Sequence, residues 1–296
     1  MFSGLSAFPL TPINENGIDE KAFSNLVSRL ANAEVDSIGA LGSTGSYAYL
    51  TREERARVAK LAVDSAQGTP VMIGIGALRT RDILQLAEDA QAAGASAVLL
   101  APVSYQKLTQ DEVFKLYEQV TRTLSVPLCV YDNPGTTHFE FTDDLHGRIA
   151  NLPNVASIKI PGVPSDLAQA TARVNRLRAL IPSNVSIGVS GDAFGATGLS
   201  AGCDAWYSVI GGLFPRTCLA ITRAAQAKDV QRADAESQRL EGIWAMFRQF
   251  GSLRVVAAAA ETLELTAAPS LPLPIQPLPE DARGKLQQIM STLDLQ

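Results

Sequence analysis

The sequence has few of the residues from which disulfide frameworks and metal sites are built. It contains three cysteines and two histidines in 296 residues. An odd number of cysteines in apolar surroundings is typical of reduced thiols. The two histidines, His138 and His146, have no partner at the spacing of metal ligands. The composition therefore predicts a cytoplasmic protein with free thiols and no metal site.

The chain also lacks the features by which proteins bind nucleic acid or enter membranes. Its net charge is −5, and no block of basic residues occurs. The first residues show no charged segment followed by an apolar run, so no signal peptide is expected. No apolar run is long enough to cross a bilayer. The sequence thus indicates neither a nucleic-acid-binding protein nor a membrane protein.

Short apolar runs alternate with amphipathic stretches along most of the chain. Many of these runs are continuous Val, Ile, Leu and Ala, as expected for parallel strands that are covered on both faces. The alternation predicts a (β/α)8 TIM barrel. An open, doubly wound sheet is the alternative, weakened because no G-x-G-x-x-G motif follows the first strand. The expected strands are residues 5–8, 37–41, 71–75, 97–101, 128–131, 155–160, 185–189 and 205–210.

Beyond about residue 228 the expected strands stop and the sequence predicts only helices. We therefore expect a catalytic barrel domain at residues 1–227 and a C-terminal helical extension at residues 228–296. A proline-rich stretch at residues 269–279 links the last two helices. The expected helices of the extension are residues 230–251, 252–264 and 281–295.

Lys159 interrupts an apolar run that is expected to be a buried strand. A charged lysine in such a strand is costly unless it is paired, and burial lowers the pKa of a lysine so that it can lose its proton. The neutral amine is a nucleophile that condenses with carbonyl compounds to give a Schiff base. The alternative is a lysine at the strand end that faces solvent or a carboxylate.

Polar residues stand at the ends of other expected strands, where the active sites of such barrels lie. The second strand ends in a Gly-Ser-Thr-Gly turn at residues 42–45, which can aim N–H groups at a carboxylate but can also be only a turn. Tyr131 ends the fifth strand and is either an acid/base or a half-buried aromatic residue. Ser-Gly-Asp at residues 190–192 ends the seventh, and Trp-Tyr-Ser at residues 206–208 lies in the eighth.

In this order on successive strands, these pieces resemble the dihydrodipicolinate synthase / N-acetylneuraminate lyase family of class I, Schiff-base-forming aldolases. The specific parts are the turn at residues 42–45, Tyr131 with Pro134, Lys159 after an isoleucine, and residues 190–192. The resemblance covers the barrel and continues into the helical extension. It implies a carbon–carbon lyase that uses no cofactor and acts on a 2-oxo acid, usually pyruvate, together with an aldehyde.

The resemblance also implies roles for single residues. Lys159 would form the imine, Ser43 and Thr44 would hold the carboxylate, and Tyr131 would move protons at the hydroxyl next to the imine. Tyr105 matches a tyrosine that the family lends to a neighbouring subunit, and Thr44 would link it to Tyr131. A homotetramer built as a dimer of dimers is therefore expected. The other residues expected around the substrate are Thr136, Gly191, Tyr207 and Val209.

One departure from the family pattern bears on the substrate. Dihydrodipicolinate synthases place an arginine a few residues past the tyrosine to bind the carboxylate of aspartate semialdehyde. This chain has Thr136 at the matching place and no arginine in residues 133–139. A hydroxyl does not replace a bidentate guanidinium. The leading hypothesis is therefore an aldolase or lyase whose second substrate is a sugar-acid-derived or neutral aldehyde. The alternatives are 4-hydroxy-tetrahydrodipicolinate synthase itself, a dehydratase or deaminating lyase, and a catalytically silent binding protein.

Overall fold

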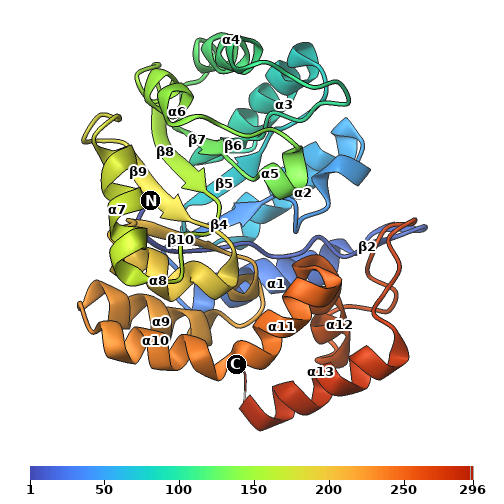
Figure 1. Cartoon of the computed structure of the whole chain (residues 1–296). Coiled ribbons are helices and arrows are strands. Elements are labelled where there is room, and N and C mark those ends of the chain that lie inside the picture. The colour runs from blue at the N-terminus through green and yellow to red at the C-terminus, as the bar shows by residue number, and fades with distance from the viewer. Residues whose placement is uncertain (294, 296) are drawn as a thin grey trace.

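The computed structural model describes residues 1–293 and 295 of the chain. Within them, eight parallel strands close into a barrel in the order β1-β10-β9-β8-β7-β6-β5-β4 (Figure 1). β1 closes the ring because it pairs with both β4 and β10. The predicted (β/α)8 barrel is confirmed. The strands are β1 (Gly4–Ala7), β4 (Ser37–Ala40), β5 (Val71–Gly74), β6 (Ala97–Leu100), β7 (Leu128–Tyr131), β8 (Val155–Ile160), β9 (Ser186–Val189) and β10 (Ala205–Ser208).

Alternate residues of the strands face two different cores. Tyr131 and Tyr207 belong to an inner cluster together with Met72 and Phe8. The neighbours Val130 and Trp206 belong to the larger cluster between the strands and the surrounding helices. This alternation follows from the two-residue period of a strand. Both faces are buried, which is why the strands are apolar almost throughout.

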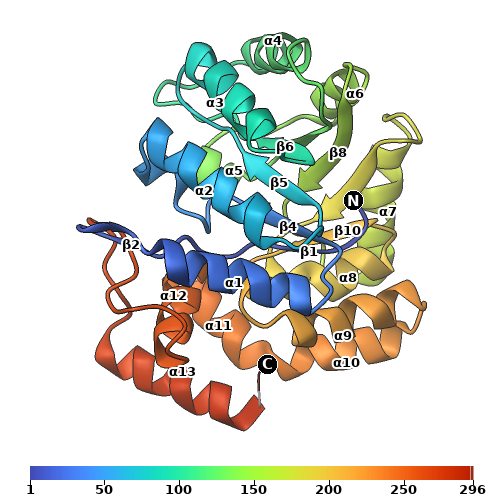
Figure 2. The ribbon, with the colours of Figure 1, turned by 180° about the vertical axis from the view of Figure 1, so that it is seen from behind.

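Helices run between the strands and cover the outside of the barrel (Figure 2). Capping boxes start α2 at Thr51 and α4 at Thr109. No helix in the described part of the chain combines the length and the apolar character that crossing a membrane needs. These helices are α1 (Glu20–Asn32), α2 (Arg52–Ser65), α3 (Thr80–Ala92), α4 (Gln110–Thr121), α6 (Asp143–Ala150), α7 (Leu167–Arg178), α8 (Gly195–Ser200) and α9 (Pro215–Gln226).

Short helical turns follow four of the strands where these reach the site. They shape the loops after β4, β7, β9 and β10, in which polar residues were expected. The turns are η1 (Tyr47–Tyr49), α5 (Pro134–Thr137), η2 (Asp192–Phe194) and η3 (Ile210–Gly212).

The C-terminal extension is helical as expected, but its first predicted helix, residues 230–251, is wrong. The chain turns at Leu240, so that α10 (Val230–Arg239) and α11 (Glu241–Phe250) are separate helices. Leu240 is buried at the turn, and the indole N–H of Trp244 reaches back to the carbonyl of Ser237 at 3.0 Å. Gly242, two residues past the turn, lies inside the range that was expected to be one helix, and the packing of Leu240 and Trp244 bends the chain just before it.

The remaining helices of the extension are close to the expected ranges. They are α12 (Ser252–Thr262) and α13 (Glu280–Leu293), and residue 294 lies outside the described residues. In Figure 1, α11 to α13 lie together beside the barrel. α10 packs on α9, and α11 contacts η2. The division of the chain into domains at residues 227 and 228 remains a prediction.

A small hairpin not expected from the sequence joins the two ends of the chain. Its strands, β2 (Ile13–Asn14) and β3 (Gly17–Ile18), pair in antiparallel fashion after β1. The N–H of Ile13 donates to the carbonyl of Ser270 at 3.3 Å, so the hairpin lies against the proline-rich link. This contact fastens the extension to the start of the barrel.

Candidate active site

A cavity of about 280 Å³ lies at the carboxyl ends of the barrel strands. Most of its wall comes from the last residues of β7, β8 and β10 and from the loops that follow β4, β7 and β9, as expected for a barrel of this kind. A second part of the wall comes from α11 and the first residue of α12. Seven residues predicted for the site line the cavity: Ser43, Tyr131, Thr136, Lys159, Gly191, Tyr207 and Val209.

Lys159 reaches the cavity from the interior of the barrel. It pairs in register with Tyr131 of the neighbouring strand, and it is 6% exposed. Its Nζ lies 4.4 Å from the centroid of the Phe8 ring, 4.6 Å from that of Tyr131 and 5.7 Å from that of Tyr207. Among the described residues, no carboxylate forms an ion pair with it. The amine is thus set among aromatic rings at one end of the cavity, facing neither open solvent nor an acidic partner.

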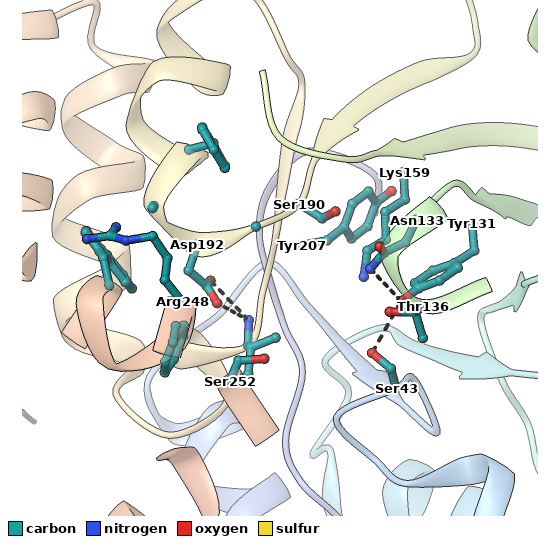
Figure 3. Close-up of a pocket in the computed structure, with 16 residues that line it drawn as sticks. Ser43, Tyr131, Asn133, Thr136, Lys159, Ser190, Asp192, Tyr207, Arg248 and Ser252 are labelled. Atoms are coloured by element: carbon teal, nitrogen blue, oxygen red, sulfur yellow. Dashed lines mark hydrogen bonds between the residues drawn. The ribbon is translucent and has the colours of Figure 1, made fainter. Parts of the chain in front are cut away.

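The hydroxyl of Tyr131 is held by two neighbours (Figure 3). It donates a hydrogen bond to Oγ of Ser43 at 3.3 Å and accepts one from Nδ2 of Asn133 at 3.2 Å. The first partner follows β4 and the second follows Tyr131 by two residues. Because the oxygen takes part as both donor and acceptor, it can either give or take a proton at the cavity.

Thr44 and Tyr105 were also predicted for the site, but neither is among the described residues that line this cavity. Thr44 is buried, and the structure gives it no hydrogen bond to Tyr131, which binds Ser43 instead. The N–H of Gly45 donates to the carbonyl of Gly42 at 2.9 Å, and this tight turn points its two central side chains in different directions. Tyr105, in the loop after β6, is 91% exposed. Its predicted role depends on a neighbouring subunit and stays a prediction, as does the relay through Thr44.

Tyr207 forms part of the cavity with its ring, while its hydroxyl points into the barrel. The hydroxyl lies 2.6 Å from Oγ of Ser157 and accepts from Sγ of Cys129 at 3.4 Å. Burial raises the pKa of this phenol well above its ordinary value. Gly188 leaves space for the ring, since a Cβ there would lie 2.2 Å from it. Tyr207 therefore shapes the cavity and is poorly suited to move protons.

Asp192 is a buried carboxylate in the wall, at the start of η2. It accepts hydrogen bonds from Oγ of Ser208 at 2.6 Å and from the N–H groups of Val209 and Ile210, at 3.1 and 3.3 Å. Burial raises its pKa from 3.8 to about 6, although these hydrogen bonds and the charge of Lys159 act in the other direction. The bonds fix the loop after β10 and so hold Val209 against the cavity.

The α11 wall was not among the residues predicted for the site. It consists of Trp244, Phe247 and Arg248, with Ser252 of α12 beside them. The guanidinium of Arg248 forms an ion pair with Glu241, the first residue of the same helix. The spacing of these two aromatic residues and the arginine indicates that they share one face of a helix. On this face Trp244 is buried and Arg248 is exposed. Local sequence does not tell which strand ends this face meets, because the packing of α11 on η2 decides it.

Comparison with known proteins places this geometry in a family. A statistical model of the Dihydrodipicolinate synthetase family matches residues 1–293. The chain belongs to this family. As a member it is a pyruvate-dependent carbon–carbon lyase, and the resemblance read from the strand ends is confirmed.

The relatives cover nearly the whole chain. The 4-hydroxy-tetrahydrodipicolinate synthase of Phenylobacterium zucineum is 30% identical over 98% of this chain and 97% of its own. The 4-hydroxy-tetrahydrodipicolinate synthase of Methylococcus capsulatus is 32% identical over 82% of this chain and 82% of its own. The crystal structure of dihydrodipicolinate synthase from Agrobacterium tumefaciens shares 46% identity at a TM-score of 0.95 and covers 99% of this chain and 98% of its own. The Acinetobacter baumannii enzyme, solved with pyruvate, shares 26% identity at a TM-score of 0.90 and covers all of both chains.

Proposed function

We propose that this enzyme makes or cleaves a 2-oxo acid through an imine between pyruvate and Lys159. The observation that carries the proposal is the buried amine of Lys159, which forms no ion pair within the described residues and lies beside the phenol of Tyr131. The family relationship supports the same chemistry. A location in the cytoplasm and a homotetramer are further parts of this proposal.

The first step joins pyruvate to the lysine. We expect the pyruvate carboxylate at the turn after β4, where the hydroxyl of Ser43 and the backbone N–H groups of the turn supply hydrogen bonds. This position presents the C2 carbonyl to Nζ of Lys159. The neutral amine adds to C2, and the C2 oxygen leaves as water after it takes one proton from the nitrogen and one from the phenol of Tyr131. The nitrogen keeps its other proton, so the product is a protonated imine.

The second step makes or breaks the carbon–carbon bond. In cleavage, Tyr131 accepts the proton of the C4 hydroxyl, the C3–C4 bond breaks, and its electron pair moves into the imine to give an enamine and an aldehyde. In synthesis, the phenolate of Tyr131 takes a proton from C3 of the protonated imine to give the enamine. C3 of the enamine then attacks the aldehyde carbon, and Tyr131 gives the proton to the aldehyde oxygen. Ser43 and Asn133 hold the phenol oxygen in both directions.

The aldehyde half is proposed to derive from a sugar acid or to be neutral. Asn133 and Thr136 line the cavity on the side of Tyr131, and both offer uncharged donors and acceptors that suit hydroxyl groups. Residues 133–139 contain no arginine that would bind a short carboxylate there. On this side of the cavity, the structure supports recognition of hydroxyls.

The second candidate is 4-hydroxy-tetrahydrodipicolinate synthase, which the names of the relatives favour. The two candidate functions predict different values of kcat/KM for aspartate semialdehyde as the partner of pyruvate. The measurement compares it with a panel of sugar-derived aldehydes. Aspartate semialdehyde would place its carboxylate beside Asn133 and Thr136, on the opposite side of the cavity from Arg248 (Figure 3). Leaving a charged group poorly paired in such a desolvated site costs on the order of 1–3 kcal/mol. We therefore expect aspartate semialdehyde to be poorer than the best aldehyde by roughly tenfold to a hundredfold. A clear advantage for aspartate semialdehyde would overturn the first candidate.

The test of the imine is covalent trapping. Wild-type enzyme mixed with pyruvate and reduced with borohydride should carry an adduct on the peptide that contains Lys159, located by mass spectrometry. The variant K159A should lose both adduct and turnover. The control K115A, which removes an exposed lysine of α4, should retain both. An adduct on another lysine, or none, would refute the proposal.

A further inference from the structure

We propose that Arg248 binds a carboxylate at the far end of the substrate, so that the preferred 2-oxo acid carries a second acid group remote from the first. The inference rests on the proposed function, because it takes the near end of the substrate to be joined to Lys159. It selects the sugar-acid branch of that proposal over the neutral one.

Arg248 lies at the opposite end of the cavity from Lys159 (Figure 3). Lys159 and Arg248 line the same cavity, one from the interior of the barrel and the other from α11. In Figure 3 they lie on opposite sides, with Asp192 between them. A substrate fixed at Lys159 that extends along this cavity therefore ends at α11. The volume of about 280 Å³ is close to the lower end of the range of about 300–1,000 Å³ for drug-sized ligands, so it suits a small acid.

Few of the residues that line the cavity carry a charge. Those that are charged are Lys159, Asp192 and Arg248. Lys159 is used by the imine. Asp192 already accepts hydrogen bonds from Ser208, Val209 and Ile210, and a negative group repels an acid. Arg248 is thus the charged side chain of this lining that is left to meet a charged group on the substrate.

Arg248 can exchange its ion-pair partner at little cost. It pairs with Glu241, but the two side chains are 59% and 62% exposed, and such surface pairs contribute little. A substrate carboxylate enclosed by Trp244 and Phe247 would meet the same guanidinium in drier surroundings, where charge attraction is stronger. The planar guanidinium matches the two oxygens of a carboxylate, which is the reason to choose a carboxylate over a larger anion.

The experiment compares two 2-oxo acids of equal chain length as probes. 2-Oxoadipate has the distal carboxylate and 2-oxohexanoate lacks it. The half-saturating concentration of each is read from borohydride trapping on Lys159 by mass spectrometry, beside pyruvate. In wild-type enzyme, we expect 2-oxoadipate to saturate at a concentration about tenfold lower than 2-oxohexanoate.

Variants assign this preference to a residue. R248Q should bring the ratio of the two half-saturating concentrations close to one. The control R239Q removes an arginine of α10 that is also 59% exposed and is paired with Glu236, and it should keep the wild-type ratio. E241Q should raise the ratio, because it removes the carboxylate that competes for Arg248.

The outcomes separate this proposal from the one it rests on. Absence of a pyruvate adduct on Lys159 in wild-type enzyme would overturn both. A normal pyruvate adduct with no preference for 2-oxoadipate would overturn the assignment of Arg248 and leave the imine proposal standing. A preference for 2-oxoadipate that persists in R248Q would also overturn the assignment of Arg248 and leave the imine proposal standing. Loss of the preference in R248Q and its retention in R239Q would support the assignment.

Discussion

Tyr131 and Lys159 are cross-strand partners, so the barrel itself sets the phenol beside the amine. The variant Y131F removes the oxygen that contacts Ser43 and Asn133 and leaves the ring in place. We expect kcat to fall by about 10²–10⁴, the usual contribution of a general acid/base, while pyruvate is still trapped on Lys159. The control Y117F removes a buried hydroxyl that donates to the carbonyl of Leu100 at 2.6 Å, and it should change stability more than kcat. A wild-type rate in Y131F would assign Tyr131 a structural role only.

Asp192 makes the stability of the enzyme depend on pH. Its pKa is about 6 in the folded protein and 3.8 ordinarily, so folding favours the protonated form. The stabilisation that comes from protonated Asp192 is then complete below about pH 4 and is lost as the pH rises through about 6. The difference of roughly two pH units corresponds to about 3 kcal/mol. The free energy of unfolding of wild-type enzyme should fall relative to that of D192N by about this amount between about pH 4 and pH 7. A difference that stays constant over this range would contradict the raised pKa.

At the scale of elements, β5 leaves room for the turn that carries Ser43. A Cβ on Gly74 would lie 1.8 Å from the carbonyl oxygen of Leu41, and backbone cannot move aside as a side chain can. G74A should therefore destabilise the protein by about 3 kcal/mol, the upper end for overpacking, and should weaken pyruvate trapping because the turn is displaced. G284A is the control. Gly284 lies in α13, and an added Cβ would have nothing within 4 Å. The variant G284A should therefore stabilise the protein by about 1 kcal/mol. Equal urea midpoints for the two variants would contradict this account.

The strands and the barrel could be predicted from the sequence because each strand is a continuous apolar run between polar loops. The break at Leu240 could not. Leu240 and Trp244 are residues that a helix accepts, and the turn forms because both side chains are buried against the rest of the protein. The hairpin β2–β3 was missed for a related reason, since its two-residue strands carry no periodic pattern.

The strand-end part of the site could also be predicted, because each of these residues follows an apolar run at the same edge of the barrel. Whether Ser43 or Thr44 meets Tyr131 was not predictable, since it depends on the course of a four-residue turn. The α11 wall was out of reach for a stronger reason. Arg248 lies 89 residues beyond Lys159 in the chain, and only tertiary packing brings the two into one cavity.

At the scale of the whole molecule, the exposure of Tyr105 bears on assembly. A tyrosine that is 91% exposed in one chain does not line that chain's own cavity, so the predicted role requires a neighbour. We expect a tetramer by sedimentation, and we expect Y105F to lower kcat without changing the sedimentation. Mixing Y105F with K159A under conditions of subunit exchange should restore part of the activity, because one subunit then supplies Tyr105 and the other Lys159. An active monomer, or mixtures with no recovered activity, would remove Tyr105 from the site.

The groups proposed for bond chemistry and the residues of the α11 wall come from different parts of the chain. The groups that we propose make and break bonds, Lys159 and Tyr131, come from the barrel strands, whereas Trp244, Phe247, Arg248 and Ser252 come after the last strand. A library randomised at these four positions would leave the closure of the barrel and the lysine untouched. Selection from it should yield catalysts with new aldehyde partners in few steps, and natural lineages could diversify by the same route.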